Sequence, residues 1–136
     1  NLEMARIYNY LLQQTGQRFT ILHSLDGYDE ISLTGDTKVI TNEGERILTP
    51  EQLGKRMVVA EDIYGGNSVE EAAKIFMKIL KGEGTWAQNA VVLANAAMAL
   101  FNTLQYPTYE EAFQEAVASL ESEKALQSFE KLISLQ

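Results

Sequence analysis

The residues best able to do chemistry are two adjacent carboxylates, Asp29 and Glu30, within Asp26-Gly27-Tyr28-Asp29-Glu30-Ile31-Ser32. A short apolar run, Phe19-Thr20-Ile21-Leu22, comes shortly before them and is typical of a buried strand. In open α/β folds, ligands bind beyond the carboxyl ends of strands, which is where this segment is expected. Carboxylate oxygens in such a place suit Mg²⁺ bound to a phosphorylated substrate.

This acidic pair can serve one metal ion only if the backbone turns, because neighbouring side chains on an extended strand point to opposite faces. Gly27 before the pair and Gly35 after it favour such a turn. A motif of two residues is also common in solvated acidic loops that bind nothing. From spacing alone, both interpretations remain open.

Other polar residues near this segment have a structural interpretation beside the functional one. His23 is the only histidine, which excludes a metal site with two histidines, and it can contact a ligand or simply hydrogen-bond within the fold. Lys38 and Arg46 can screen phosphate charge or protect an edge strand from aggregation. None of the three identifies a reaction.

The segment Gly65-Gly66-Asn67-Ser68 precedes a predicted helix, and free N–H groups at a helix start can bind phosphate. Glu70 and Glu71 fall in the first turn, however, where they would repel an anion. This pattern favours a turn followed by a helix cap.

Composition narrows the class of protein. The chain has 136 residues, and 11 basic against 19 acidic residues give a net charge of −8, which argues against nucleic acid or an anionic membrane as a partner. The absence of cysteine excludes disulfides and thiolate metal sites. With no signal peptide or membrane span predicted, we expect a cytoplasmic protein.

Hydrophobic periodicity and capping signals predict the elements that would position the acidic pair. They are a helix over 2–14, a strand over 18–23, a hairpin from 37–40 and 46–48, a short helix from Thr49-Pro50, and helices after Ser68, over 85–104, after Thr108 and after Ser122. The helix over 85–104 is apolar almost all round and is predicted to be central and buried. One strand plus a hairpin leaves sheet edges unpaired, so further strands are expected upstream of Asn1. Residues 1–136 are predicted to be a single segment without a domain boundary.

Several stretches, taken in order, resemble the carboxyl-terminal portion of anthranilate phosphoribosyltransferases. They are Asn1-Leu2 with Met4-Ala5, the strand into Leu22-His23, the Asp26–Ser32 segment, Gly65-Gly66 with Glu70-Glu71-Ala72-Ala73, Leu80-Lys81-Gly82-Glu83-Gly84, and the run Asn89–Ala97. The resemblance covers essentially all 136 residues.

The resemblance implies an α/β fold, namely the carboxyl-terminal part of a nucleoside phosphorylase/phosphoribosyltransferase-type domain, helix-rich with a few strands and a hairpin. It implies transfer of phosphoribosyl from phosphoribosyl pyrophosphate to anthranilate in tryptophan biosynthesis, by a full-length homodimer. Asp29 and Glu30 would bind Mg²⁺, and no catalytic residue is assigned. The phosphate and anthranilate segments of the family lie upstream, as does the amino-terminal helical domain, so we expect these 136 residues alone to be inactive.

Two other functions remain open at this point. Pyrimidine nucleoside phosphorylases share the overall fold, and a fold does not determine function. They would not need the metal-binding pair, so a Mg²⁺ requirement would argue against them. A non-catalytic binding module is the third hypothesis, and the net charge of −8 argues against nucleic acid as its partner.

Overall fold

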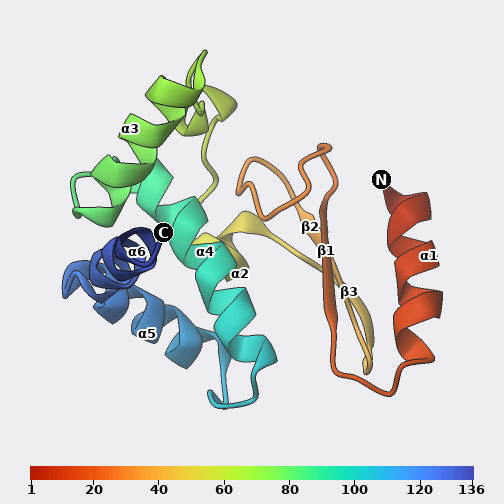
Figure 1. The fold of residues 1–136 in the computed structure, drawn as a ribbon. Coiled ribbons are helices and arrows are strands. Elements are labelled where there is room, and N and C mark those ends of the chain that lie inside the picture. The colour runs from red at the N-terminus through yellow and green to blue at the C-terminus, as the bar shows by residue number, and fades with distance from the viewer. The chain divides into compact units, whose positions relative to one another are not determined.

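The computed structural model describes all residues from 1 to 136 and contains six α-helices, one 3-10 helix and three strands (Figure 1). The chain divides into two compact units, Asn1–Val59 and Ala60–Gln136. Each unit has its own elements, and each is described by itself.

The first unit is a three-stranded antiparallel sheet with a helix packed on it. It comprises α1 (Leu2–Gln13), β1 (Thr20–Ser24), β2 (Thr37–Thr41), β3 (Gly44–Leu48) and α2 (Pro50–Gly54). The strands are ordered β1-β2-β3, with Leu22 opposite Val39 and Val39 opposite Arg46. Figure 1 shows α1 alongside this sheet. A small cluster of Ala5, Phe19 and Ile40 joins helix and sheet, because each of these side chains loses most of its contact with water.

Residues 25–36 form the long connection between β1 and β2, and Leu33 anchors it. Leu33 is fully buried although its φ of 60° lies in the left-handed region, which L-residues seldom adopt. Its carbonyl accepts a hydrogen bond of 3.0 Å from the Val58 N–H. Its side chain lies against Gly54, where a Cβ would overlap Leu33 Cδ1 and lie 2.9 Å from Cδ2. Glycine at position 54 therefore makes room for the residue that fixes the connection.

The second unit is helical. It comprises the 3-10 helix η1 (Ala60–Ile63), α3 (Val69–Leu80), α4 (Trp86–Asn102), α5 (Tyr109–Glu121) and α6 (Lys124–Ser134). Helices α4 and α5 pack closely because α4 presents small buried residues, including Ala90, Ala94 and Ala97. The Tyr109 hydroxyl donates to the Ala94 carbonyl at 3.2 Å, and burial raises the pKa of Tyr109 well above its usual range.

The observed elements confirm the predicted order of helices, strand and hairpin. The Thr108 side chain accepts from the Glu111 N–H and caps α5, and Pro50 is the first residue of α2, as the sequence predicts. The fold is α/β and helix-rich, with the predicted few strands and hairpin.

Two details of the sequence prediction were wrong. Helix α4 is not buried all round, because Trp86 is 44% exposed and Val92 40% exposed. Ser122 ends α5 instead of capping the last helix, and the residue before α6 is Glu123 with a φ of 60°. None of the helices combines the length and apolar character needed to span a bilayer.

We predict that Gly54→Ala destabilises the protein by about 1–3 kcal/mol, because the new methyl group would push a fully buried Leu33 out of its place. Urea unfolding followed by circular dichroism measures this change. Gly65→Ala is the matched control, since nothing lies within 4 Å of its Cβ position, and it should stay within about 1 kcal/mol of the parent. Equal stability of the two variants would contradict the close approach at Gly54.

Candidate functional site

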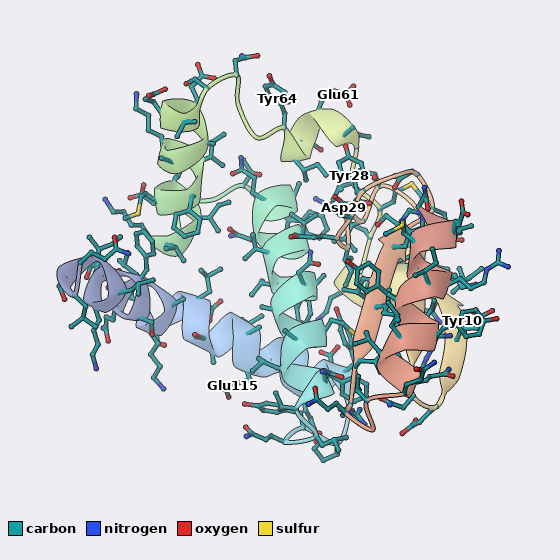
Figure 2. All side chains as sticks on the ribbon, turned by 45° about the vertical axis from the view of Figure 1, so that its right-hand side comes forward. Tyr10, Tyr28, Asp29, Glu61, Tyr64 and Glu115 are labelled. Carbon is teal, nitrogen blue, oxygen red and sulfur yellow. The ribbon has the colours of Figure 1, made fainter.

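The acidic pair lies on the surface of the first unit, beyond the carboxyl end of β1. Asp29 and Glu30 are both exposed, and the backbone bends at these two residues instead of continuing as a strand. The backbone therefore does not continue as an extended strand, which would direct the two side chains to opposite faces. Figure 2 labels Asp29, together with Tyr28, on this connection.

Ser24, the last residue of β1, holds the connection from inside. Its side chain is fully buried, and its Oγ donates to the Glu30 carbonyl at 2.6 Å. The same oxygen accepts from the Ser32 N–H at 3.3 Å and lies 3.4 Å from Thr37 Oγ1. One hydroxyl group thus links the strand end, the backbone of the acidic pair and the start of β2. Buried polar groups joined in this way cost little to bury and are expensive to leave unpaired.

Backbone hydrogen bonds close the base of the same connection. The Leu25 N–H donates to the Asp36 carbonyl at 2.8 Å, and the Ser24 N–H donates to the Tyr28 carbonyl at 3.1 Å. A third bond of 3.0 Å runs from the Gly27 N–H to the Ser24 carbonyl. The segment before the acidic pair is therefore a tight turn.

The third carboxylate of the segment, Asp26, is engaged within the protein. Its Oδ2 accepts a hydrogen bond from Thr34 Oγ1, and its Oδ1 lies 3.5 Å from Ser32 Oγ. A Cβ at position 35 would lie 3.2 Å from Asp26 Oδ2, so Gly35 permits the carboxylate to come close. Asp29 and Glu30, in contrast, make no side-chain hydrogen bond or ion pair within the chain, so their oxygens can take an external ligand.

The carboxylate oxygens of Asp29 and Glu30 are of the type that Mg²⁺ takes as ligands in proteins. No group of three or more His, Cys, Asp or Glu side chains gathers into a complete metal site. Magnesium commonly binds one or two protein carboxylates and takes its remaining ligands from water and substrate phosphates. Asp29 and Glu30 offer two exposed carboxylates of this kind, without the further protein ligands that would enclose a metal ion completely.

The basic residues considered above lie on the three strands of the sheet. Lys38 pairs with Glu45 at 2.9 Å on the hairpin, and Arg46 is exposed on β3. His23 is half-buried on β1 opposite Lys38. The ammonium group of Lys38 therefore forms its ion pair with Glu45 of the hairpin.

The start of α3 is satisfied by its own residues, as predicted. Ser68 Oγ accepts from the Glu71 N–H at 3.2 Å, and Glu71 Oε2 accepts from the Asn67 N–H at 2.7 Å. The backbone N–H of Glu70 and the Ser68 hydroxyl lower the pKa of the Glu70 carboxyl. This helix start already carries negative charge and is a cap, not a phosphate site.

The asparagines of α4 have different surroundings. The Asn95 side chain donates to the Val91 carbonyl at 2.8 Å, which is a bond within the helix. The Asn89 Oδ1 is buried and has no hydrogen-bond partner, and it lies where a Cβ on Gly84 would be.

Sequence reasoning missed the residues that hold the pair in place, namely Ser24, Asp26, Ser32, Leu33 and Thr34. The sequence shows them as ordinary loop and strand residues. Their only visible signal is the density of short hydroxyl and acidic side chains between positions 24 and 37, which favours local hydrogen bonding over a regular strand.

Comparison with known proteins assigns the chain to a class. The sequence model of the family described as "Glycosyl transferase family, a/b domain" matches residues 1–126, so the chain belongs to this family.

Among individual relatives, the anthranilate phosphoribosyltransferase of Christiangramia forsetii is 53% identical over 135 residues, covering 99% of this chain and 40% of that protein. The enzyme of the same name from Flavobacterium johnsoniae is 52% identical, covering 99% of this chain and 41% of that protein. The chain thus spans about two fifths of the length of the curated relatives it matches.

Solved structures agree on the fold. The crystal structure of anthranilate phosphoribosyltransferase (TrpD) from Thermus thermophilus matches with a TM-score of 0.86 and 27% identity, over 98% of this chain and 40% of that one. The enzyme from Saccharomyces cerevisiae, solved in complex with PRPP and Mg, matches with a TM-score of 0.83 and 22% identity, over 96% of this chain and 38% of that one. The predicted fold type and the predicted family resemblance are confirmed.

We predict that Ser24→Ala lowers the free energy of unfolding by about 1–3 kcal/mol, because the Glu30 carbonyl and the Ser32 N–H lose a buried partner. Denaturant titration measures the loss. The control is Ser134→Ala, whose hydroxyl donates to the Lys131 carbonyl at the exposed end of α6, with an expected change within about 0.5 kcal/mol. A Ser24→Ala protein as stable as this control would show that the buried hydroxyl does not support the connection.

Proposed function

We propose that these residues are the carboxyl-terminal part of the α/β domain of an anthranilate phosphoribosyltransferase. The full-length enzyme would transfer phosphoribosyl from phosphoribosyl pyrophosphate (PRPP) to the amino group of anthranilate, a step of tryptophan biosynthesis. The observation that carries the proposal is the pair Asp29 and Glu30, exposed on an internally braced turn beyond the end of a strand. It occurs in a chain 53% identical to an enzyme of that name across almost its whole length.

In this proposal Asp29 and Glu30 hold a magnesium ion that accompanies the pyrophosphate group. Bound there, Mg²⁺ would neutralise charge on the departing pyrophosphate. The chain's own contribution is to present two carboxylates on one turn. Without a cation they would repel the pyrophosphate, since like charges a few ångströms apart disfavour each other strongly outside bulk water.

The rest of the enzyme would supply the other contacts of both substrates. A metal site alone does not orient the anthranilate amine against the ribose carbon, and orientation accounts for much of the rate of a two-substrate reaction. We further propose a cytoplasmic homodimer as the working form, with neither nucleic acid nor membrane as a partner, and the 136 residues as one segment of its catalytic domain.

The test follows the loss of anthranilate fluorescence by the full-length protein in the presence of PRPP and Mg²⁺. We predict turnover by the parent and a loss of kcat/KM on the order of 100-fold in Asp29→Asn/Glu30→Gln, because charge stabilisation at the leaving group is lost. The matched control is Asp36→Asn/Glu43→Gln, which removes the same charge from exposed positions of the same unit and should leave the rate unchanged.

Two results would contradict the proposal. A folded full-length parent that does not consume anthranilate would exclude the reaction, and phosphorolysis of thymidine or uridine by that protein would assign it to the nucleoside phosphorylases. Full activity of the doubly substituted protein would leave the reaction in place but remove Asp29 and Glu30 from it.

The 136-residue chain by itself is predicted to show no turnover above background at any Mg²⁺ concentration, because the proposed metal site alone would not orient the two substrates. The same fluorescence assay measures this. Turnover by the isolated chain, after removal of contaminating enzyme, would overturn the prediction.

A further inference from the structure

We propose that Asp26 is a positioning residue for the acidic pair and not a third metal ligand. Together with Thr34, Ser32 and Ser24 it would hold the turn so that the Asp29 and Glu30 carboxylates are placed before a cation arrives. This inference rests on the metal site of the proposed function and adds residues that the family resemblance does not single out.

Hydroxyl groups of the turn lie close to both oxygens of Asp26, and one of them donates a hydrogen bond. Thr34 Oγ1 donates to Oδ2, and Ser32 Oγ lies 3.5 Å from Oδ1. An ionised carboxylate accepting from a hydroxyl forms a charge-assisted hydrogen bond, which is stronger than a bond between neutral groups. Coordination of a cation through these oxygens would compete with those hydroxyls for the lone pairs of the carboxylate. Asp29 and Glu30 carry no such cost.

The hydrogen bonds from Asp26 continue into the buried part of the unit. Thr34 Oγ1 lies 2.9 Å from Ser32 Oγ, and the Thr34 N–H donates to Ser32 Oγ at 3.3 Å. Ser32 in turn contacts Ser24 Oγ at 3.3 Å, and Ser24 donates to the Glu30 carbonyl. A path of hydroxyl groups therefore runs from Asp26, at the surface, to the backbone of the acidic pair.

The space around Asp26 is limited on the side of Gly35. A Cβ on residue 35 would lie 3.2 Å from Oδ2 and 3.3 Å from Cγ of Asp26, which is closer than most such contacts. Gly35 thus provides the room that the inward position of the carboxylate needs. An Asp26 side chain turned outward as a ligand would not need it.

Because Asp26 is exposed and Thr34 only partly buried, water competes for their bonds, and their effect on global stability should be small. Their effect on the placement of Glu30 should be larger. Groups that orient metal ligands without touching the metal typically change affinity by about 10–100-fold when removed. Metal affinity is therefore the property to measure.

The full-length protein is titrated with Mn²⁺, in place of Mg²⁺, in the presence of PRPP. Electron paramagnetic resonance measures the concentration of free Mn²⁺, which gives the dissociation constant. We expect Thr34→Val to raise the dissociation constant about 10-fold. Thr34→Ser, which keeps the hydroxyl, should stay within about twofold of the parent, since the donor to Asp26 is retained. Thr41→Val is the matched control: it removes a hydroxyl of the same unit that bonds only within the hairpin, and should leave the dissociation constant unchanged.

Asp26→Asn provides a second variant of nearly the same shape, and thermal unfolding of each variant verifies that it is folded. We expect Asp26→Asn to weaken Mn²⁺ binding about as much as Thr34→Val, because both remove the same charge-assisted bond. If Asp26 were a direct ligand, Asp26→Asn would weaken binding while Thr34→Val would leave it unchanged or tighten it. That result would overturn the inference.

Different results would contradict the proposed metal site and the proposed positioning role of Asp26. Unchanged Mn²⁺ binding in Asp29→Asn/Glu30→Gln would remove the site itself, and the positioning role with it. Weakened binding in that variant, with parent-like binding in Thr34→Val, would retain the site and overturn only the role of Asp26.

Discussion

The site depends on one buried hydroxyl group at the end of a strand. Ser24 Oγ donates to the Glu30 carbonyl and accepts from the Ser32 N–H, so the backbone on both sides of Ile31 is tied to β1. The group is fully buried, which means that no water can replace it without disturbing the sheet. The bend that places two neighbouring carboxylates at the surface is fixed by this interaction. We therefore expect the bend to form without a metal ion.

The rest of the first unit supports that arrangement from the other end of the connection. Leu33, in a left-handed conformation, is buried against Gly54, and its carbonyl accepts from Val58. Such a conformation costs about 1–3 kcal/mol and persists only where packing enforces it. The strand β1, the helix α2 and the segment after it thus act together as a frame for residues 25–36. A rigid frame with exposed, unengaged carboxylates suits a ligand that brings its own charge and phosphate oxygens.

Much of this could be predicted from the sequence, and the reason is local. Capping pairs such as Thr108 with Glu111, and Pro50 at a helix start, act within one turn of chain, so the spacing reveals them.

The Asp29 and Glu30 pair was found because the two carboxylates are adjacent. The sequence analysis gave Asp26 no role, since its proposed role depends on Thr34 and Gly35, which approach it only after the connection folds. No sequence pattern predicts that Leu33 has a positive φ, because leucine is uncommon in the left-handed region and only tertiary packing holds it in that conformation. The helix over 85–104 was predicted to be buried because it is apolar almost all round, yet composition does not show which side of a helix finds a partner, and Trp86 is 44% exposed.

The most direct test of the central claim is amide hydrogen exchange of the full-length protein without Mg²⁺ and without PRPP. If the protein itself builds the turn, the amides of Leu25, Ser32 and Thr34, whose N–H groups donate to Asp36, Ser24 and Ser32, will exchange slowly in the metal-free protein. Their protection should change little when both ligands are added. Free exchange of these three amides, with protection gained only in the presence of Mg²⁺ and PRPP, would show that the ligand orders the turn and would contradict the account.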